Sequence, residues 1–191
     1  MSTFPEWNEF GVLPPFMQSN AAQFGRSPYI VELNDFVLRY STSQERKDIL
    51  VGYLKFRKAC HNAGIVDGFH WIDGSFTENI ELVESRTPND IDLVTFFKVP
   101  AGQTQETLFA AHPNLFDQGA IKTQLHIDSY WVCLNSETRF LIHNAAYWNS
   151  LWSHRRNATW KGYIQIDLST MNEDDLIAEL QAVPTKEAID A

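Results

Sequence analysis

Two short apolar stretches near the middle of the chain have the length and composition of core strands. The first covers residues 69–73 and leads directly into Gly74 and Ser75. The second covers residues 90–99, begins with an acidic pair and is closed by a Pro-Ala-Gly sequence. We therefore expect two core strands, the first of which ends in a tight turn.

The acidic pair consists of Asp90 and Asp92. Because side chains alternate between the two faces of a strand, both carboxylates point one way, while Ile91 and Leu93 point the other. Two like charges beside a core repel each other and lose hydration, and a divalent cation relieves both effects. Mg²⁺ takes oxygen ligands from one or two carboxylates and completes its shell with water and substrate phosphate. The pair is therefore a candidate magnesium site.

A third strand is expected over residues 124–134, where alternation puts His126, Asp128 and Tyr130 on one face. Asp128 is a lone acid in an apolar strand and requires a partner. His126 on the same face is either a proton shuttle or a hydrogen-bonded strand histidine.

Helical periodicity elsewhere predicts helices separated by loops. We expect helices at residues 29–40, 43–64, 76–83, 104–111, 138–153 and 171–183, loops at 85–89 and 117–122, and an edge strand at 160–168. The second helix is capped by Thr42 or Ser43. Its charged residues, which include Arg46 and Arg57, are interpreted as a solvated face.

The Gly-Ser turn followed by an Asp-x-Asp strand resembles the signature of the polymerase-β-type nucleotidyltransferases. The N-terminal sequence at residues 7–15, together with IDGSF and PNDIDLVTFF, is similar to a family of uncharacterised prokaryotic proteins in that superfamily, over residues 7–135. The resemblance implies an α/β (α+β) fold, with a nucleotidyltransferase-like mixed sheet flanked by helices. It also implies Mg²⁺-dependent transfer of a nucleotide to a hydroxyl on a protein, an RNA end or a small molecule, in a toxin–antitoxin or phage-defence system.

The resemblance implies roles for individual residues. Asp90, Asp92 and Asp128 would hold Mg²⁺, which Mn²⁺ can replace, and would carry the catalysis, with Asp128 as general base. Gly74 and Ser75 would grip the nucleoside triphosphate, because glycine lets the backbone approach an anion and turn amides donate to phosphate.

A basic cluster follows the helix at 138–153. Arg155 and Arg156 are candidate nucleotide-binding residues, because guanidinium groups suit phosphate, although basic residues are also favoured at a helix C-terminus. Asp73 is interpreted as capping the turn rather than binding metal. Trp148 and Trp152 either pack in the core or stack a base.

The chain departs from the superfamily pattern after the Gly-Ser turn, where Glu78 and Glu81 stand instead of a basic residue. This difference favours an alternative, a catalytically inactive module that binds nucleotide or a partner protein. A third interpretation is a structural α/β domain whose acids are surface residues.

The bulk properties fit one domain at residues 29–184, with an arm at 1–28 packed on it and a frayed tail at 185–191. The 191 residues carry a net charge of −9, which argues against broad nucleic-acid binding. No apolar run is long enough to cross a membrane and the N-terminus has no signal pattern, so we expect a cytoplasmic protein. Cys60 and Cys133 are expected to be buried thiols.

Overall fold

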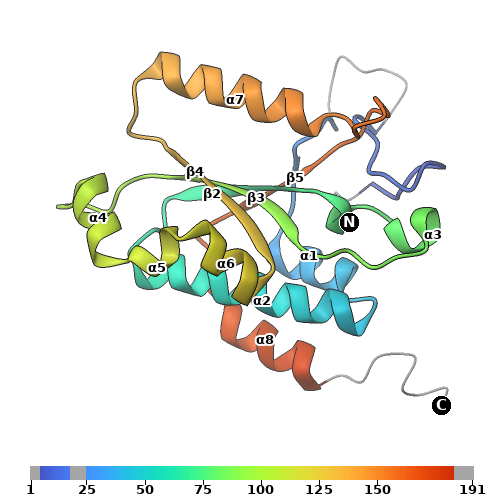
Figure 1. Ribbon diagram of the computed structural model, residues 1–191, viewed down its shortest axis with the longest axis horizontal. Coiled ribbons are helices and arrows are strands. Elements are labelled where there is room, and N and C mark those ends of the chain that lie inside the picture. The colour runs from blue at the N-terminus through green and yellow to red at the C-terminus, as the bar shows by residue number, and fades with distance from the viewer. Residues whose placement is uncertain (1–4, 18–24, 183–191) are drawn as a thin grey trace.

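The computed structural model describes residues 5–17 and 25–182, which form a five-stranded mixed sheet with helices on both faces (Figure 1). The strand order is β1-β5-β2-β3-β4, in which β1–β5 and β3–β4 are parallel, while β2 is antiparallel to both of its neighbours. The strands are β1 (Tyr29–Ile30), β2 (Gly68–Asp73), β3 (Ile91–Phe97), β4 (Ile127–Cys133) and β5 (Ile164–Asp167). The expected α+β fold, a mixed sheet flanked by helices, is confirmed.

Eight α-helices and one short 3₁₀ helix occur in this described part of the chain. The helices are α1 (Leu33–Tyr40), α2 (Gln44–Asn62), η1 (Ser75–Thr77), α3 (Ile80–Glu84), α4 (Gln105–Ala111), α5 (Pro113–Phe116), α6 (Gln118–Leu125), α7 (Thr138–Trp152) and α8 (Glu173–Ala182). None of the helices formed by these residues is long and apolar enough to cross a membrane.

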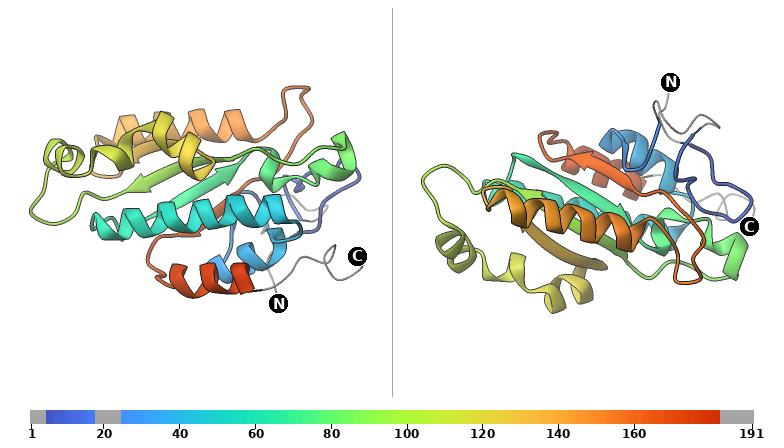
Figure 2. Two further views of the ribbon diagram at one scale, coloured as in Figure 1. Left: turned by 60° about the horizontal axis from the view of Figure 1, so that its bottom comes forward. Right: turned by 90° about the horizontal axis from the view of Figure 1, so that it is seen from above.

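The two faces of the sheet are covered unequally. Helix α7 runs across one face, and α2 lies beneath the other, with α1 and α8 packed against it (Figure 2). Alternation along β3 divides its side chains between the two cores: Leu93 and Phe97 belong to the larger core on the α2 side, and Val94 and Phe96 to the smaller core under α7. Asp92 therefore belongs to the α7 face, as the alternation predicts.

Several expected elements differ from the structure. Residues 29–30, expected to begin a helix, form β1, and α1 begins only at Leu33. Residues 124–125, expected to begin a strand, are the end of α6. The segment at 117–122, expected as a loop, begins helix α6, because the Asp117 side chain accepts a hydrogen bond from the Ala120 amide (3.0 Å) and caps it. A further short helix, α5, follows the expected helix at 104–111 and starts at Pro113, as proline can at a first helical position. Strand β5 is not an edge strand, since the two-residue β1 covers its outer side.

The arm contacts the body through fewer residues than its aromatic content suggests. Trp7 donates its indole N–H to the Thr77 carbonyl (2.9 Å), and Leu13 is buried, whereas Phe10 is 53% exposed. Residues 1–4, 18–24 and 183–191 lie outside the described residues, so the packing of the whole arm and the fraying of the tail stay predictions. Cys60 and Cys133 are both buried free thiols, as expected.

The solvated face expected on α2 is wrong for Arg46, of which only 1% is exposed. Its guanidinium donates to Glu81 Oε2 (2.9 Å) and to the carbonyls of Phe76 and Glu78, both at 2.7 Å. Arg46 therefore fixes the backbone of the segment that follows the Gly-Ser turn.

Arg57 is also buried, on the same side of α2 eleven residues later. It donates to Glu173 Oε1 (3.0 Å) at the start of α8, and to the carbonyls of Asp167 (3.0 Å) and Thr170 (2.9 Å) between β5 and α8. The Arg57 side chain is 0% exposed and the Glu173 side chain 5%, so water stabilises neither charge and each is stabilised by the other. Arg57 thus attaches α8 to α2.

Replacing Arg57 by Met leaves Glu173 buried without its guanidinium partner and with only the His61 imidazole nearby (3.4 Å), which should lower the free energy of unfolding by about 3–5 kcal/mol. The neighbouring Lys58→Met variant is the control, because its pair with Asp174 is exposed (46% and 72%) and its loss should cost less than about 1 kcal/mol. Urea denaturation measures both variants. If both variants lose the same free energy of unfolding, the buried ion pair contributes no more to stability than the exposed one.

Candidate functional site

Three aspartates stand side by side at one end of the sheet. The register pairs Asp73 of β2 with Asp92 of β3, and Asp92 with Asp128 of β4. Residues directly opposite each other on neighbouring strands have Cβ atoms about 5 Å apart, at which distance like charges destabilise each other. Strand pairing alone therefore creates a row of three carboxylates that needs positive charge.

The Gly-Ser turn lies against the centre of this row. Gly74 has φ +87°, and a Cβ atom built on it would lie 2.0 Å from Asp92 Oδ2. Only glycine fits this position, because any side chain would be strained and would also collide with the carboxylate. Ser75, the next residue, is half-buried and begins η1. The turn thus brings backbone directly to the central aspartate.

Lys161 neutralises one end of the row. Its ammonium group lies 2.9 Å from Asp73 Oδ2 and 3.0 Å from Glu78 Oε1, and all three residues are buried. Burial raises the pKa of Asp73 to about 6, although Lys161 opposes the shift. No side-chain hydrogen bond caps η1, so the expectation that Asp73 caps this turn is wrong. The Asp73 carboxylate instead forms the ion pair with Lys161.

Lys122 of α6 neutralises the other end. Its Nζ lies 2.8 Å from Asp128 Oδ2 and 3.0 Å from Asp90 Oδ2, and Gln118 Nε2 donates to Asp128 Oδ1 (2.7 Å). The sequence interpretation missed both residues, because it treated the start of α6 as a loop. The signal was available: Gln118 and Lys122 are four apart, which puts them on one face of a helix.

Asp92, in the middle, forms no ion pair with any residue of the described part of the chain. Burial, reinforced by the charges of three neighbouring carboxylates, raises its pKa to about 7. Within residues 5–17 and 25–182, no three carboxylate, imidazole or thiolate groups are arranged to hold a metal ion as they stand. The expected set of Asp90, Asp92 and Asp128 is thus brought together, but with Lys122 between two of its members.

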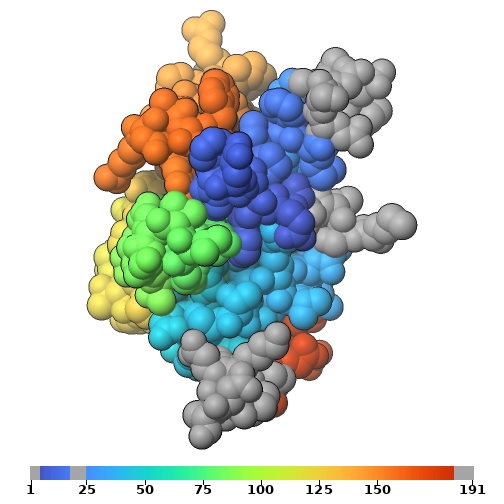
Figure 3. Space-filling model, turned by 90° about the vertical axis from the view of Figure 1, so that its right-hand side faces the viewer, coloured from blue at the N-terminus to red at the C-terminus, as the bar shows by residue number. Residues whose placement is uncertain are grey.

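A cavity of about 520 Å³ adjoins this row, lined by residues that include Gly74, Ser75, Asp92, Arg155 and Arg156. The loop after α7, the α3 segment and the arm meet on this side of the molecule (Figure 3). Asp92 therefore borders the same space as the candidate nucleotide residues, which are far apart from it in sequence, whereas Asp90 and Asp128 do not line this cavity.

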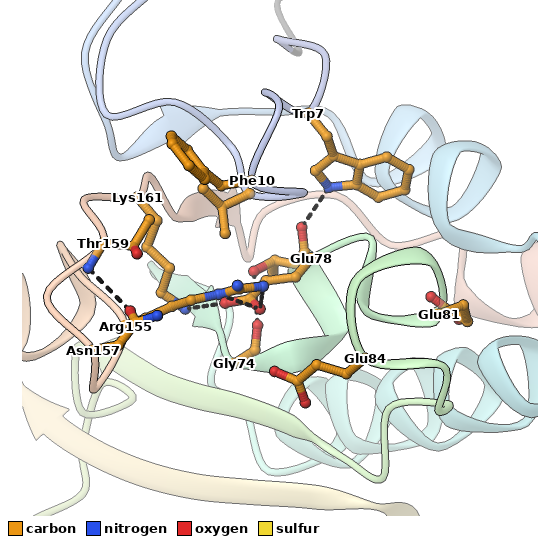
Figure 4. A network of polar contacts seen from close by, with 12 residues as sticks. Trp7, Phe10, Gly74, Glu78, Glu81, Glu84, Arg155, Asn157, Thr159 and Lys161 are labelled. Atoms are coloured by element: carbon orange, nitrogen blue, oxygen red, sulfur yellow. Dashed lines mark hydrogen bonds and ion pairs between the residues drawn. The ribbon is translucent and has the colours of Figure 1, made fainter.

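The two arginines in this cavity differ. Arg155 is half-buried and donates from Nε to Glu78 Oε2 (2.9 Å), and its second contact to the same oxygen is also drawn in Figure 4. Arg156 is exposed and forms no ion pair with the described residues. Glu78 was seen in the sequence only as a departure from the family pattern; its role as partner of Arg155 and Lys161 was missed, since nothing local marks pairs 77 and 83 residues apart.

Two neighbouring expectations are also settled by the structure. His126 is not on the Asp128 face of β4; it ends α6 with φ +58° and is exposed. Trp148 and Trp152 are buried in the smaller core, which excludes them as free platforms for stacking a base.

The fold and this site define an α+β protein with a partly neutralised carboxylate row beside a tight glycine turn. The chain belongs to the family described as "Family of unknown function (DUF6932)", whose model matches residues 5–167. The match includes the whole sheet and all of the site residues above. No curated protein and no solved structure gave a significant match.

The raised pKa of Asp92 predicts how stability depends on pH when a chelator is present. The pKa of an aspartate is about 3.9 in the unfolded chain, and that of Asp92 is about 7 in the folded protein. Between these two pH values the folded state binds more protons than the unfolded state, so the free energy of unfolding falls by about 1.4 kcal/mol per pH unit as the pH rises. Asp92→Asn should remove this contribution. Its stability should match that of wild type near pH 4 and exceed it near pH 8, as measured by urea denaturation.

Asp67→Asn is the matched control, because Asp67 lies just before the opposite end of β2 and is exposed, with Lys98 as partner (2.8 Å). It should keep the pH dependence of wild type. If Asp92→Asn also keeps that dependence, the pKa of Asp92 is not raised in the folded protein.

Proposed function

We propose that this protein is a Mg²⁺-dependent nucleotidyltransferase, which transfers a nucleotide from a nucleoside triphosphate to a hydroxyl group on a protein, an RNA end or a small molecule. The observation that carries the proposal is Asp92: a half-buried carboxylate between two other carboxylates, without an ion pair to the described residues, and in contact with a glycine turn. Such a carboxylate favours a bound cation over its own protonation.

The residues present suit a divalent cation of the hard, oxygen-binding kind. Asp92 and Asp128 would hold it, and Asp90 would join them when Lys122 moves aside; nearly half of the Lys122 side chain is exposed, so it has room to do so. A buried oxygen of Asp73, Oδ1, has no hydrogen-bond partner among the described residues and provides a further acceptor nearby. Bound Mg²⁺, or Mn²⁺, supplies positive charge for the attacking hydroxyl and the leaving pyrophosphate.

The chain's own groups have separate tasks in this proposal. Asp128 accepts the proton of the acceptor hydroxyl as general base. The turn at Gly74 and Ser75 presents backbone amides and a hydroxyl to the phosphates, and it can approach closely because Gly74 has no side chain. Arg156 is exposed beside the cavity, and Arg155 lies next to it, so both are placed to bind phosphate oxygens.

One observation favours a second candidate, a module that binds nucleotide or a partner protein without turnover. Lys122, Lys161 and Arg155 are each already paired with carboxylates of the chain. A site in which every carboxylate except Asp92 is already paired depends less on a metal for its stability.

The biological setting is proposed from the family resemblance. A toxin–antitoxin or phage-defence system in the cytoplasm, with a protein partner or a small acceptor, agrees with a chain of net charge −9, which is unsuited to broad contact with nucleic acid.

Label transfer tests the proposed activity. Wild-type protein is incubated with each α-labelled nucleoside triphosphate, Mg²⁺ or Mn²⁺, and a cell extract that supplies acceptors. We expect labelled product from wild type and from the Asp67→Asn control. Asp92→Asn and Asp128→Asn should lose at least about a hundredfold in rate, because general-base catalysis alone contributes 10²–10⁴-fold.

Metal-dependent nucleotide binding without transfer in wild type would instead support the inactive module. Transfer that persists in both variants would contradict the assigned residues. If wild type shows neither nucleotide binding nor transfer, the interpretation that remains is a structural α/β domain.

A further inference from the structure

Glu78 is a buried carboxylate at the edge of the candidate site. Its carboxylate is only 5% exposed and lies between two cations: Oε1 is 3.0 Å from Lys161 Nζ, and Oε2 is 2.9 Å from Arg155 Nε (Figure 4). It lies four residues after Gly74 and lines the same cavity of about 520 Å³. A carboxylate held by a guanidinium and an ammonium group imitates the contacts of a phosphate.

The charges of this group balance. Arg155 and Lys161 contribute two positive charges, and Glu78 and Asp73 contribute two negative ones. An added phosphate therefore meets no free positive charge from these residues while Glu78 remains in place. If the Glu78 carboxylate moves out, Lys161 keeps Asp73 as partner, and the guanidinium of Arg155 becomes available.

The backbone at Glu78 is held independently of its side chain. Arg46 donates to the Glu78 carbonyl (2.7 Å), and the Glu78 amide donates to the Ser75 carbonyl (3.2 Å). On either side, Trp7 donates to the Thr77 carbonyl, and the Asn79 amide donates to the Gly11 carbonyl (2.8 Å). Rotation of the Glu78 side chain can therefore free Arg155 without opening the segment.

We propose that Glu78 is an internal inhibitor of the cavity, whose carboxylate occupies the phosphate position and must leave before the phosphates of a ligand bind. This inference rests on the proposed function for the identity of the ligand, a nucleoside triphosphate. It adds a regulatory residue that competes with the ligand for Arg155.

Inorganic tripolyphosphate in metal-free buffer is the probe, and titration calorimetry measures its dissociation constant. Glu78→Gln keeps the size of the side chain but removes its charge, and should bind tripolyphosphate at least about tenfold more tightly than wild type, or about 1.4 kcal/mol. Adding Arg155→Met to this variant should abolish the gain, because Arg155 is the cation set free.

Glu84→Gln is the matched control. Glu84 lines the same cavity and carries the same charge, but pairs with Arg86 (2.8 Å) and touches neither Arg155 nor Lys161. Arg86 also lines the cavity, but its pair with Glu84 is already exposed (43% and 46%), so Glu84→Gln should gain much less affinity for tripolyphosphate than Glu78→Gln does. If both variants gain the same affinity, the gain comes from the lower negative charge of the cavity as a whole and not from the release of Arg155, and the inference is overturned.

Circular dichroism and melting temperature check that Glu78→Gln is folded. If it is not, Glu78→Asp replaces it: the charge stays, but the shorter side chain cannot reach both cations, and a gain in affinity is again expected. No gain in the folded variant overturns the inference.

The probe contains neither metal nor a transferable nucleotide, so the two proposals fail separately. Tighter binding by Glu78→Gln, without label transfer in either wild type or Glu78→Gln, supports the internal inhibitor and rejects the enzyme. Label transfer in wild type without tighter tripolyphosphate binding by Glu78→Gln supports the enzyme and rejects the internal inhibitor.

Discussion

The register of three neighbouring strands is the constraint on which the site depends. Antiparallel pairing of β2 with β3 and parallel pairing of β3 with β4 put Asp73, Asp92 and Asp128 in one row. Their like charges oppose folding, and the chain compensates at both ends of the row, with Lys161 at Asp73 and Lys122 at Asp128. The centre is left to Asp92, whose pKa is raised by burial and by the charges of the neighbouring carboxylates.

The surrounding fold holds this arrangement in place with charges that are themselves buried. Arg46 fixes the carbonyls after the Gly-Ser turn, and Arg57 attaches α8 to α2. Removal of either guanidinium would leave a carboxylate or carbonyl groups without partners, which costs more than the pair itself contributes. The site is thus supported from the α2 side of the sheet, while its open side is bounded by the loop that follows α7.

Local patterns predicted the strands that carry the aspartates, because alternation and the Gly-Ser turn are properties of neighbouring residues. They failed at Arg46 and Arg57, where composition indicated a solvated face, although a spacing of eleven residues puts both on the buried stripe of α2. They also failed at Lys122, since a short polar helix resembles a loop. The partners of Glu78 depend on packing across the whole chain, and no local signal reveals them.

Nuclear magnetic resonance with substoichiometric Mn²⁺ tests most directly whether the aspartate row binds a divalent cation. A bound paramagnetic ion broadens the signals of nearby amides. The account predicts that the amides of Gly74, Asp92 and Asp128 broaden first, and that Asp92→Asn abolishes this selectivity. Earlier broadening at the acidic first turn of α8, Glu173–Asp175, or no selective broadening at all, would contradict it.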